Sequence, residues 1–403
     1  MNRIMLACLL LSPAIGHAQP APPVAIAGET VYTMAGPPIR NGVVLVRNGK
    51  IERAGASLAI PSGYRLIEAK VVTPGLIDAH TVVGLAGYLN QPHDQDQLER
   101  SAPIQPELRA IDAYNPREDL VAWLRGFGIT TIHTGHAPAA LMSGQTMIVK
   151  TRGDTVDEAM VRPAAMIAVA LGQAGLGQEN KSPGTRPKEI AMLRTELVKA
   201  QEYERKLKSA PQDSRPGRDL GLEMLGKVLR KELPLLVTAD RARDILAALR
   251  VAKEFDINVV LDSAAEAYLV ADQIKAAGVP VILHATMSRA NGDAENLSFE
   301  TASILRKAGI PVALQSGFES YVPKTRVVLF EAAIAAANGL TPQEALATVT
   351  IDAARILGIA ARAGSIEAGK DADLALFDGD PFEYTTHVTH VLIDGHVVSD
   401  QRR

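Results

Sequence analysis

The sequence predicts an α/β protein, with a (β/α)8 barrel in the middle of the chain and a smaller β domain built from its two ends. Eight apolar runs of strand length alternate with helical patterns, which is typical of parallel βα units. Both ends of the chain carry short β-type runs separated by turn residues. The chain has 403 residues, 47% of them hydrophobic, so it can bury one barrel and an appended domain.

The middle of the chain supplies the barrel strands. Several of them follow a helix that closes on glycine, as at Gly128 and Gly278, which fits a helix end turning into the next strand. In a barrel of this type the chemistry lies at the carboxyl ends of the strands. The eight candidate strands are Val71–Asp78, Ile129–Thr134, Thr146–Lys150, Ala164–Ala170, Leu233–Thr238, Ile257–Asp262, Val279–His284 and Ile310–Gln315.

The two β-rich ends are predicted to form one composite β-sandwich. Asn48-Gly49 and Asp394-Gly395 are typical two-residue hairpin turns, one near each end. The candidate strands around them are Val24–Ala27, Gly42–Val46, Ile51–Ala54, Leu374–Phe377 and Val388–Ile393.

These patterns divide the chain into segments. Residues 19–72 and 359–403 are the two parts of the composite sandwich, and 73–358 are the barrel. A polar insertion covers about 172–219. Within it an apolar spacing predicts a helix packed on the barrel wall, through Ile190, Leu193, Leu197 and Tyr203.

Residues 1–18 read as an export signal. Arg3 gives a positive start, residues 4–15 are apolar but too short to span a bilayer, and Gly16-His17-Ala18 is a small-x-small cleavage site. We therefore expect cleavage after Ala18 and a periplasmic or secreted protein. The one cysteine, Cys8, lies in this signal, so the mature chain is expected to have no disulfide.

Charge and composition restrict the partners. The formal net charge is −3 and aromatic residues make up 4% of the chain, without a basic run interleaved with aromatics. This argues against nucleic-acid binding. We expect a small-molecule or short-peptide ligand and no membrane contact once the signal is removed. The sequence leaves a homo-oligomer open.

Three motifs carry a family resemblance. The run from Val72 to His80 (VTPGLIDAH), Gly364–Ile366 and Gly369–Leu374 together resemble the amidohydrolase superfamily, closest to its imidazolonepropionase-like and prolidase-like members. The resemblance covers essentially the whole mature chain. It implies a TIM-type barrel beside a composite sandwich, and hydrolysis of carbon–nitrogen bonds.

The resemblance also implies a metal centre, and this sequence departs from it. The family draws ligands from a His-x-His after strand 1, a lysine or glutamate on strand 4, histidines on strands 5 and 6, and an aspartate on strand 8. Here His80 is followed by Val82, strand 4 has no lysine or carboxylate, Thr238 ends strand 5, and Ser316 follows strand 8. Because stable zinc sites use three or four ligands, we expect no binuclear centre. A site for a single divalent ion is still an alternative, and His80 is the only family ligand that the sequence retains.

The candidate site residues lie near the predicted strand ends. The catalytic candidates are His80, His133, His136, Asp262 and His284. The substrate-binding candidates are Thr238, Asp240, Gln315, Ser316, Tyr321 and Lys324. The alternative is that the histidines are hydrogen-bonded residues filling space once occupied by metal. The segment Asn291–Asn296 is predicted to be only a flexible loop.

These observations favour an exported amidohydrolase-family hydrolase that acts on non-peptide or dipeptide-type amide bonds with an altered or lost metal site. Two alternatives remain: a catalytically inactive relative that binds a small molecule or peptide in the barrel mouth, and a structural or partner-binding protein. The metal-ligand set separates the first two, because only a working centre requires it.

Overall fold

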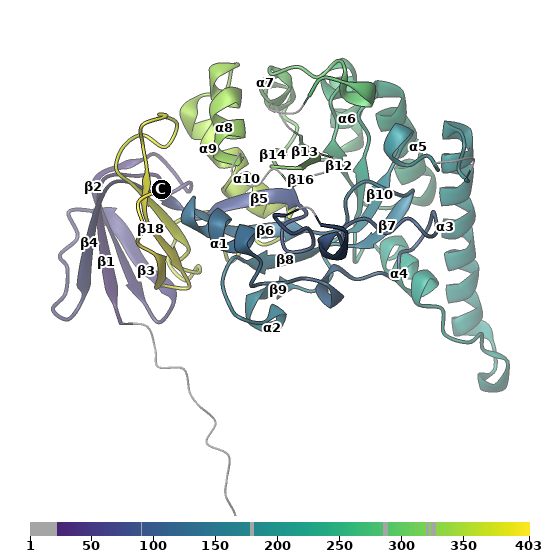
Figure 1. Cartoon of the computed structure of the whole chain (residues 1–403), viewed down its shortest axis with the longest axis horizontal. Coiled ribbons are helices and arrows are strands. Elements are labelled where there is room, and N and C mark those ends of the chain that lie inside the picture. The colour runs from purple at the N-terminus through teal and green to yellow at the C-terminus, as the bar shows by residue number, and fades with distance from the viewer. Residues whose placement is uncertain (1–21, 90, 178–180, 285–288, 320–321, 324–327) are drawn as a thin grey trace, which may run out of the picture.

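The computed structural model describes residues 22–89, 91–177, 181–284, 289–319, 322–323 and 328–403. Figure 1 shows a β domain on the left and a larger α/β body beside it. The predicted signal 1–18 and the candidates Tyr321 and Lys324 lie outside the described residues. Among the described helices, none combines the length and apolar character needed to cross a bilayer.

The β domain is one seven-stranded sheet with strands from both ends of the chain. Its order is β19-β18-β17-β4-β1-β2-β3, and β17 from the C-terminal end pairs antiparallel with β4 from the N-terminal end. Strands from both ends of the chain therefore lie in one composite domain, which is built as a single continuous sheet. The strands are β1 (Val24–Val31), β2 (Ile39–Arg47), β3 (Lys50–Ala56), β4 (Arg65–Pro74), β17 (Leu374–Phe377), β18 (Val388–Ile393) and β19 (His396–Ser399).

Both predicted hairpin turns are present in this sheet. Asn48 and Gly49 have φ values of 52° and 77°, and Asp394 and Gly395 have 49° and 74°. Two consecutive residues with positive φ are what a two-residue turn between antiparallel strands requires. The two turns touch, because a Cβ added to Gly49 would lie 3.0 Å from the carbonyl oxygen of Asp394. The sheet thus curls until its two hairpins meet.

The α/β body contains two larger sheets and a two-stranded hairpin among the described residues, which confirms the predicted mixed α/β class. A four-stranded sheet has the order β5-β6-β8-β9, and a six-stranded sheet has the order β14-β13-β12-β11-β10-β7. β5 is parallel to β6, and β10 to β14 are parallel to one another. The bounds are β5 (Leu76–Thr81), β6 (Ile129–Thr134), β7 (Met142–Gln145), β8 (Met147–Lys150), β9 (Met160–Arg162), β10 (Ile167–Ala170), β11 (Leu235–Thr238), β12 (Val259–Ser263), β13 (Val281–Leu283) and β14 (Val312–Leu314), with a short hairpin of β15 (Phe318–Glu319) and β16 (Val322–Pro323).

The prediction of eight parallel strands was wrong at the third strand. The predicted run Thr146–Lys150 forms β8, which is antiparallel to β6, and the preceding β7 is antiparallel to β10. Only residues 135–141 separate β6 from β7. A parallel strand needs a crossover of a dozen or more residues, so this short connection returns the chain in the opposite direction.

The first predicted strand, Val71–Asp78, is split at Gly75. β4 ends at Pro74 in the β domain and β5 begins at Leu76 in the body. A Cβ at Gly75 would lie 2.1 Å from the side-chain oxygen of Thr130, so only glycine fits this close approach. The break passes the chain between the two domains and places His80 inside β5.

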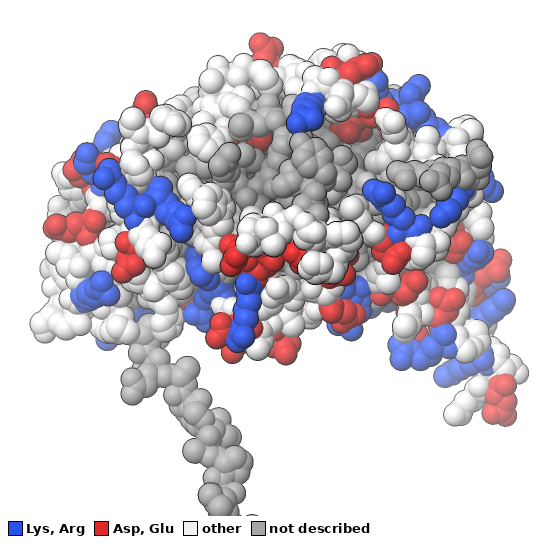
Figure 2. Space-filling model, in the orientation of Figure 1, with Lys and Arg blue, Asp and Glu red and all other residues white. Residues whose placement is uncertain are grey.

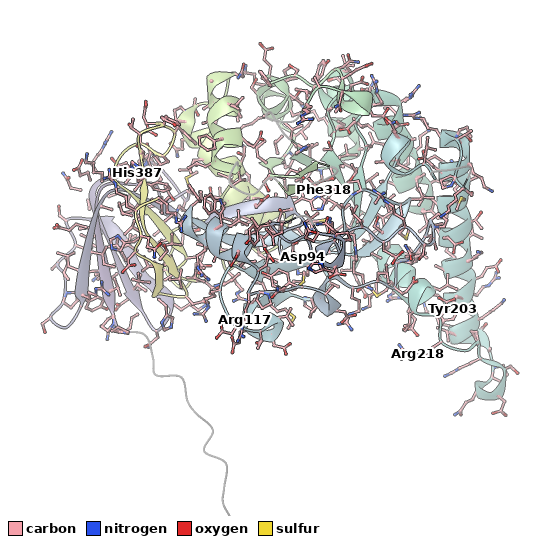
Figure 3. The ribbon with its side chains drawn as sticks, in the orientation of Figure 1. Asp94, Arg117, Tyr203, Arg218, Phe318 and His387 are labelled. Atoms are coloured by element: carbon pink, nitrogen blue, oxygen red, sulfur yellow. The ribbon has the colours of Figure 1, made fainter. Side chains whose placement is uncertain are left out.

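Helices cover the body. The predicted helix of the polar insertion is present as α3, and its buried residues Leu193, Leu197 and Tyr203 have the expected spacing. Figure 3 shows Tyr203 on this helix and Arg218 beside it, on the segment between α3 and α4. Acidic and basic side chains are interspersed over the face drawn in Figure 2. The helices are α1 (Asp119–Gly126), α2 (Val156–Ala159), α3 (Arg186–Ser209), α4 (Leu220–Leu229), α5 (Ala242–Phe255), α6 (Ala271–Ala277), α7 (Thr301–Lys307), α8 (Val328–Ala337), α9 (Pro342–Thr348) and α10 (Ile351–Ile356).

A buried lysine joins the body to the β domain. Lys150, at the end of β8, forms ion pairs with Asp371 at 2.8 Å and Asp373 at 3.0 Å, and also with Asp394. Burial alone would lower the pKa of Lys150, but the three carboxylates outweigh it and raise the pKa. The ammonium group therefore stays charged and holds the two domains together.

We predict that Lys150→Met destabilises the protein by about 3–5 kcal/mol, because it leaves the buried carboxylate of Asp373 without its ion-pair partner. Lys50→Met is the matched control. Lys50 also pairs with Asp371, but its side chain is 50% exposed against 6% for Lys150, so its loss should cost at most about 1 kcal/mol. Urea denaturation measures both changes, and equal effects would contradict the prediction.

Candidate functional site

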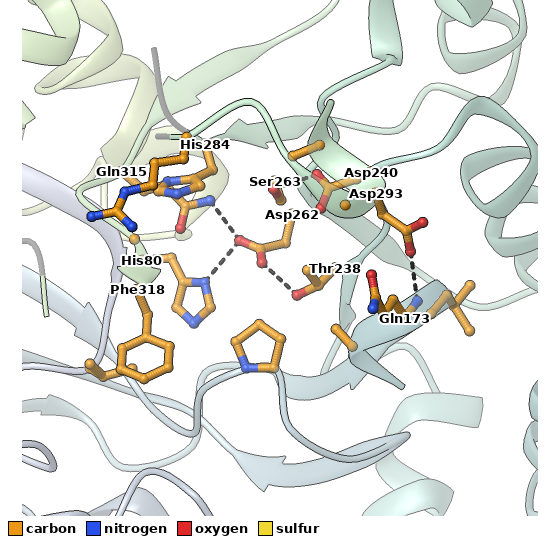
Figure 4. Close-up of a pocket in the computed structure, with 18 of the residues that line it drawn as sticks. His80, Gln173, Thr238, Asp240, Asp262, Ser263, His284, Asp293, Gln315 and Phe318 are labelled. Carbon is orange, nitrogen blue, oxygen red and sulfur yellow. Dashed lines mark hydrogen bonds and ion pairs between the residues drawn. The ribbon is translucent and has the colours of Figure 1, made fainter. Parts of the chain in front are cut away.

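A cavity of about 410 Å³ opens where the parallel strands of the body end. Figure 4 shows its lining, with side chains contributed by β5, β11 and β12 and by the segments that follow β13 and β14. Six of the residues singled out from the sequence line it together: His80, Thr238, Asp240, Asp262, His284 and Gln315.

Asp262 is the centre of the hydrogen bonds in this cavity. Its Oδ1 accepts from His80 Nδ1 at 2.8 Å and from Gln315 Nε2 at 2.8 Å. Its Oδ2 accepts from the Thr238 hydroxyl at 2.6 Å. Both oxygens of a buried carboxylate are thus satisfied by donors from three separate parts of the chain, as Figure 4 shows.

His80 and Asp262 form a buried ion pair. Burial alone would lower the pKa of His80 and raise that of Asp262. Their opposite charges and shared hydrogen bond outweigh burial, so the pKa of His80 is raised and that of Asp262 is lowered. The other ring nitrogen, His80 Nε2, is buried and has no hydrogen-bond partner among the described residues. This nitrogen is available to a ligand in the cavity.

Ser316, expected to bind substrate, instead lies beneath the cavity. Its backbone N–H donates to Asp78 Oδ1 at 3.0 Å, and its hydroxyl donates to Asp78 Oδ2. Burial raises the pKa of Asp78 to about 6. Asp78 was not among the candidate site residues, because its partner Ser316 follows β14 and lies 238 positions away in the sequence.

His133 and His136, expected to be catalytic, do not line the cavity. His133 Nδ1 donates to the carbonyl oxygen of Ala79 at 2.7 Å, and its Nε2 accepts from the Thr146 hydroxyl at 2.6 Å. Burial, together with the charge of His80, lowers the pKa of His133 to about 3. Both histidines are buried, and neither ring nitrogen of His136 has a hydrogen-bond partner among the described residues. Figure 3 places another histidine, His387, in the β domain, away from the body.

The segment after β13 was predicted to be only a flexible loop, yet it forms part of the cavity wall. Asp293 lines the cavity, accepts from the backbone N–H of Gln173 at 2.6 Å, and pairs with Arg186 at 3.1 Å and Arg241 at 3.5 Å. Its place after a barrel strand was the signal that could have identified it. Further lining residues that the sequence analysis missed are Arg100, Pro138, Leu171, Gln173, Ser263, Arg289 and Phe318.

Asp240 differs from the other two carboxylates of the lining. Its Oδ1 accepts from the Ser263 hydroxyl at 2.6 Å and from the backbone N–H of Ala265 at 3.2 Å. Burial raises the pKa of Asp240, and the nearby charges of Asp262 and Asp293 act in the same direction. Among the described residues, the hydrogen-bond donors to this carboxylate are neutral groups.

Comparison with known proteins assigns this architecture to a family. An amidohydrolase from Thermotoga maritima MSB8 has a solved structure that matches with a TM-score of 0.89 and 30% sequence identity, over 94% of this chain and 100% of that protein. The chain belongs to the amidohydrolase family. The family model itself matches residues 320–398.

Two sequence relatives agree with this assignment. An imidazolonepropionase from Mesorhizobium japonicum is 25% identical over 84% of this chain and 87% of its own length. Amidohydrolase tasK from Hapsidospora irregularis is 26% identical over 88% of this chain, which spans only 39% of that larger protein. The predicted resemblance is confirmed, and these matches support a hydrolase that acts on carbon–nitrogen bonds.

We predict that His133 makes stability fall in mild acid. The folded-state pKa of about 3 lies below the unfolded value of about 6.5, so the folded state resists protonation. The contribution of neutral His133 to the free energy of unfolding is complete above the unfolded-state pKa. It declines by about 1.4 kcal/mol per pH unit as the pH falls toward the folded-state pKa. Urea denaturation between about pH 7 and 5 should therefore show a shallower pH dependence for His133→Gln than for wild type. His93→Gln, an exposed control, should follow wild type; identical slopes for all three proteins would refute the prediction.

Proposed function

We propose that this chain is an exported amidohydrolase-family hydrolase that cleaves the amide bond of a small molecule or short peptide in the cavity, with a site that has lost the family's metal-ligand set. The observation that carries the proposal is the buried His80–Asp262 pair, whose Nε2 is available to a ligand. Family membership alone supports the reaction class, and this pair supports where in the cavity the reaction takes place.

The proposal includes a closed barrel. Backbone hydrogen bonds cross both seams between the two sheets of the body. On one side Gly317 N donates to His80 O at 3.2 Å, and on the other Thr146 N donates to Met166 O at 2.9 Å. These contacts support a closed ring of eight strands in which β7 and β8 together form the third, antiparallel strand.

The residues present do not fit the family's metal centre. Val82 is buried and has no lone pair, the Thr238 hydroxyl donates to Asp262, and Ser316 donates to Asp78. A stable site for a divalent transition metal uses three or four side-chain ligands. Within the described part of the chain, no three His, Cys, Asp or Glu residues are arranged to hold an ion. The proposed chemistry therefore contains no metal step.

Acid–base chemistry at His80 fits this arrangement. Hydrolysis adds the hydroxyl of water to the acyl carbon and gives the remaining proton to the departing nitrogen as the carbon–nitrogen bond breaks. His80 Nε2 is the group that can carry this proton, and Asp262 orients the ring and stabilises its protonated form. Thr238 and Gln315 keep Asp262 in place.

A second candidate function is binding without turnover. The specific observation in its favour is the same loss of metal ligands, since water activation in the family depends on them. The cavity and its polar lining serve a bound ligand equally well in either case.

We predict that wild-type protein purified without chelator holds less than one equivalent of transition metal, and that its hydrolysis of a panel of p-nitroanilides and dipeptide amides survives EDTA. His80→Gln should lower kcat/KM by about 10²- to 10⁴-fold, the usual contribution of an acid–base group. The exposed His93→Gln control should leave the rate unchanged. Activity that EDTA abolishes and zinc restores would overturn the metal-free site, and ligand binding without turnover of any substrate would select the second candidate.

Export is the remaining part of the proposal. The apolar segment 4–15 after Arg3, followed by Gly16-His17-Ala18, supports it. We predict that the mature protein from a Gram-negative host begins at Gln19 and is released with the periplasmic fraction. N-terminal sequencing tests this, and an intact Met1 in the cytoplasmic fraction would reject it.

A further inference from the structure

Three carboxylates line the cavity, and two of them have cationic partners. Asp262 is paired with His80, and Asp293 with Arg186 and Arg241. Asp240 makes no ion pair among the described residues. Both of its side-chain hydrogen bonds, from the Ser263 hydroxyl and Ala265 N–H, go to Oδ1. Its Oδ2 thus has no protein donor in the described part of the chain.

The position of the charges decides what this oxygen can bind. The two arginines of the lining, Arg100 and Arg289, are exposed, so they lie toward the rim of the cavity. Asp240 is partly buried. A carboxylate removed from water is stabilised only when donors satisfy it. Asp240 Oδ2 therefore lacks a hydrogen-bond donor among the described residues. A cationic donor on a ligand would supply both the hydrogen bond and the positive charge.

A second polar atom of the lining is placed to contact the other end of the ligand. His80 Nε2 is buried, has no hydrogen-bond partner among the described residues, and belongs to a ring that lines the same cavity. Figure 4 shows His80 and Phe318 on one side, Asp240 on the other, and Asp262 with Thr238 between them. A ligand spanning the cavity meets a donor at His80 and an acceptor at Asp240.

We propose that the cavity selects amides that carry a free ammonium group, with the ammonium on Asp240 Oδ2 and the amide carbonyl oxygen at His80 Nε2. Phe318, Pro138 and Leu171 of the lining supply apolar contacts for the rest of such a molecule. This selection rests on the proposed function for its reactive group, but it concerns binding and is measured without turnover.

The test compares three probes that share a benzyl group and a primary amide by titration calorimetry: phenylalaninamide, N-acetylphenylalaninamide and 3-phenylpropionamide. At about pH 6 the α-amino group of the first is protonated. Wild type should bind phenylalaninamide roughly tenfold more tightly than the two neutral probes, as expected for one added charge-assisted hydrogen bond. Asp240→Asn should remove this preference. Asp272→Asn, an exposed aspartate on α6, should keep it.

A second variant distinguishes a loss of binding preference from a loss of folding. Asp240→Glu retains the charge and should retain part of the preference, whereas Asp240→Asn retains the acceptor for Ser263 and Ala265 but not the charge. The proposal is overturned if the neutral probes bind as tightly as the ammonium probe, if 3-phenylpropionate binds more tightly than all three, if no probe binds, or if Asp240→Asn keeps the preference. Ammonium selection without hydrolysis would instead sink the proposed function and leave this inference standing.

Discussion

The buried carboxylate of Asp262 organises the open end of the body. A charge at this depth is unfavourable unless donors surround it, and here the donors come from His80 on β5, Thr238 on β11 and Gln315 after β14. Those positions are far apart in sequence. By requiring all three donors at once, Asp262 fixes how the two sheets of the body meet, and it leaves His80 Nε2 without a partner among the described residues.

The same rule governs the joint between the domains. Lys150 and the buried aspartates Asp371 and Asp373 are a second buried set of opposite charges, completed by Asp394 at its edge, and a buried charge of either sign is unfavourable without the other. The aspartates belong to the C-terminal segment that carries the Gly369–Leu374 motif and to the adjoining hairpin. The motif that indicated the family thus also connects the two domains.

The residues that line the cavity come from two kinds of segment, strand ends and connecting segments. Strand-end residues form the floor, while the wall comes from connecting segments held by ion pairs such as Asp293 with Arg186 and Arg241. In a protein of this fold, such connecting segments set specificity while the strands set the chemistry. Asp240 follows β11 directly and lies where these two parts meet, which suits a residue that recognises the ligand rather than transforms it.

The sequence by itself determined the mixed α/β class, the hairpin turns at Asn48-Gly49 and Asp394-Gly395, the packed helix of the insertion and the family, because each follows from local periodicity, turn chemistry or a short motif. It also selected six residues that meet in one cavity. Only the tertiary structure decided that β8 runs antiparallel, that His133 and Ser316 lie beneath the cavity, and that Asp293 forms its wall. Strand direction depends on the room left for a crossover. Which polar group reaches the cavity depends on partners supplied by distant strands, and neither can be read from neighbouring residues.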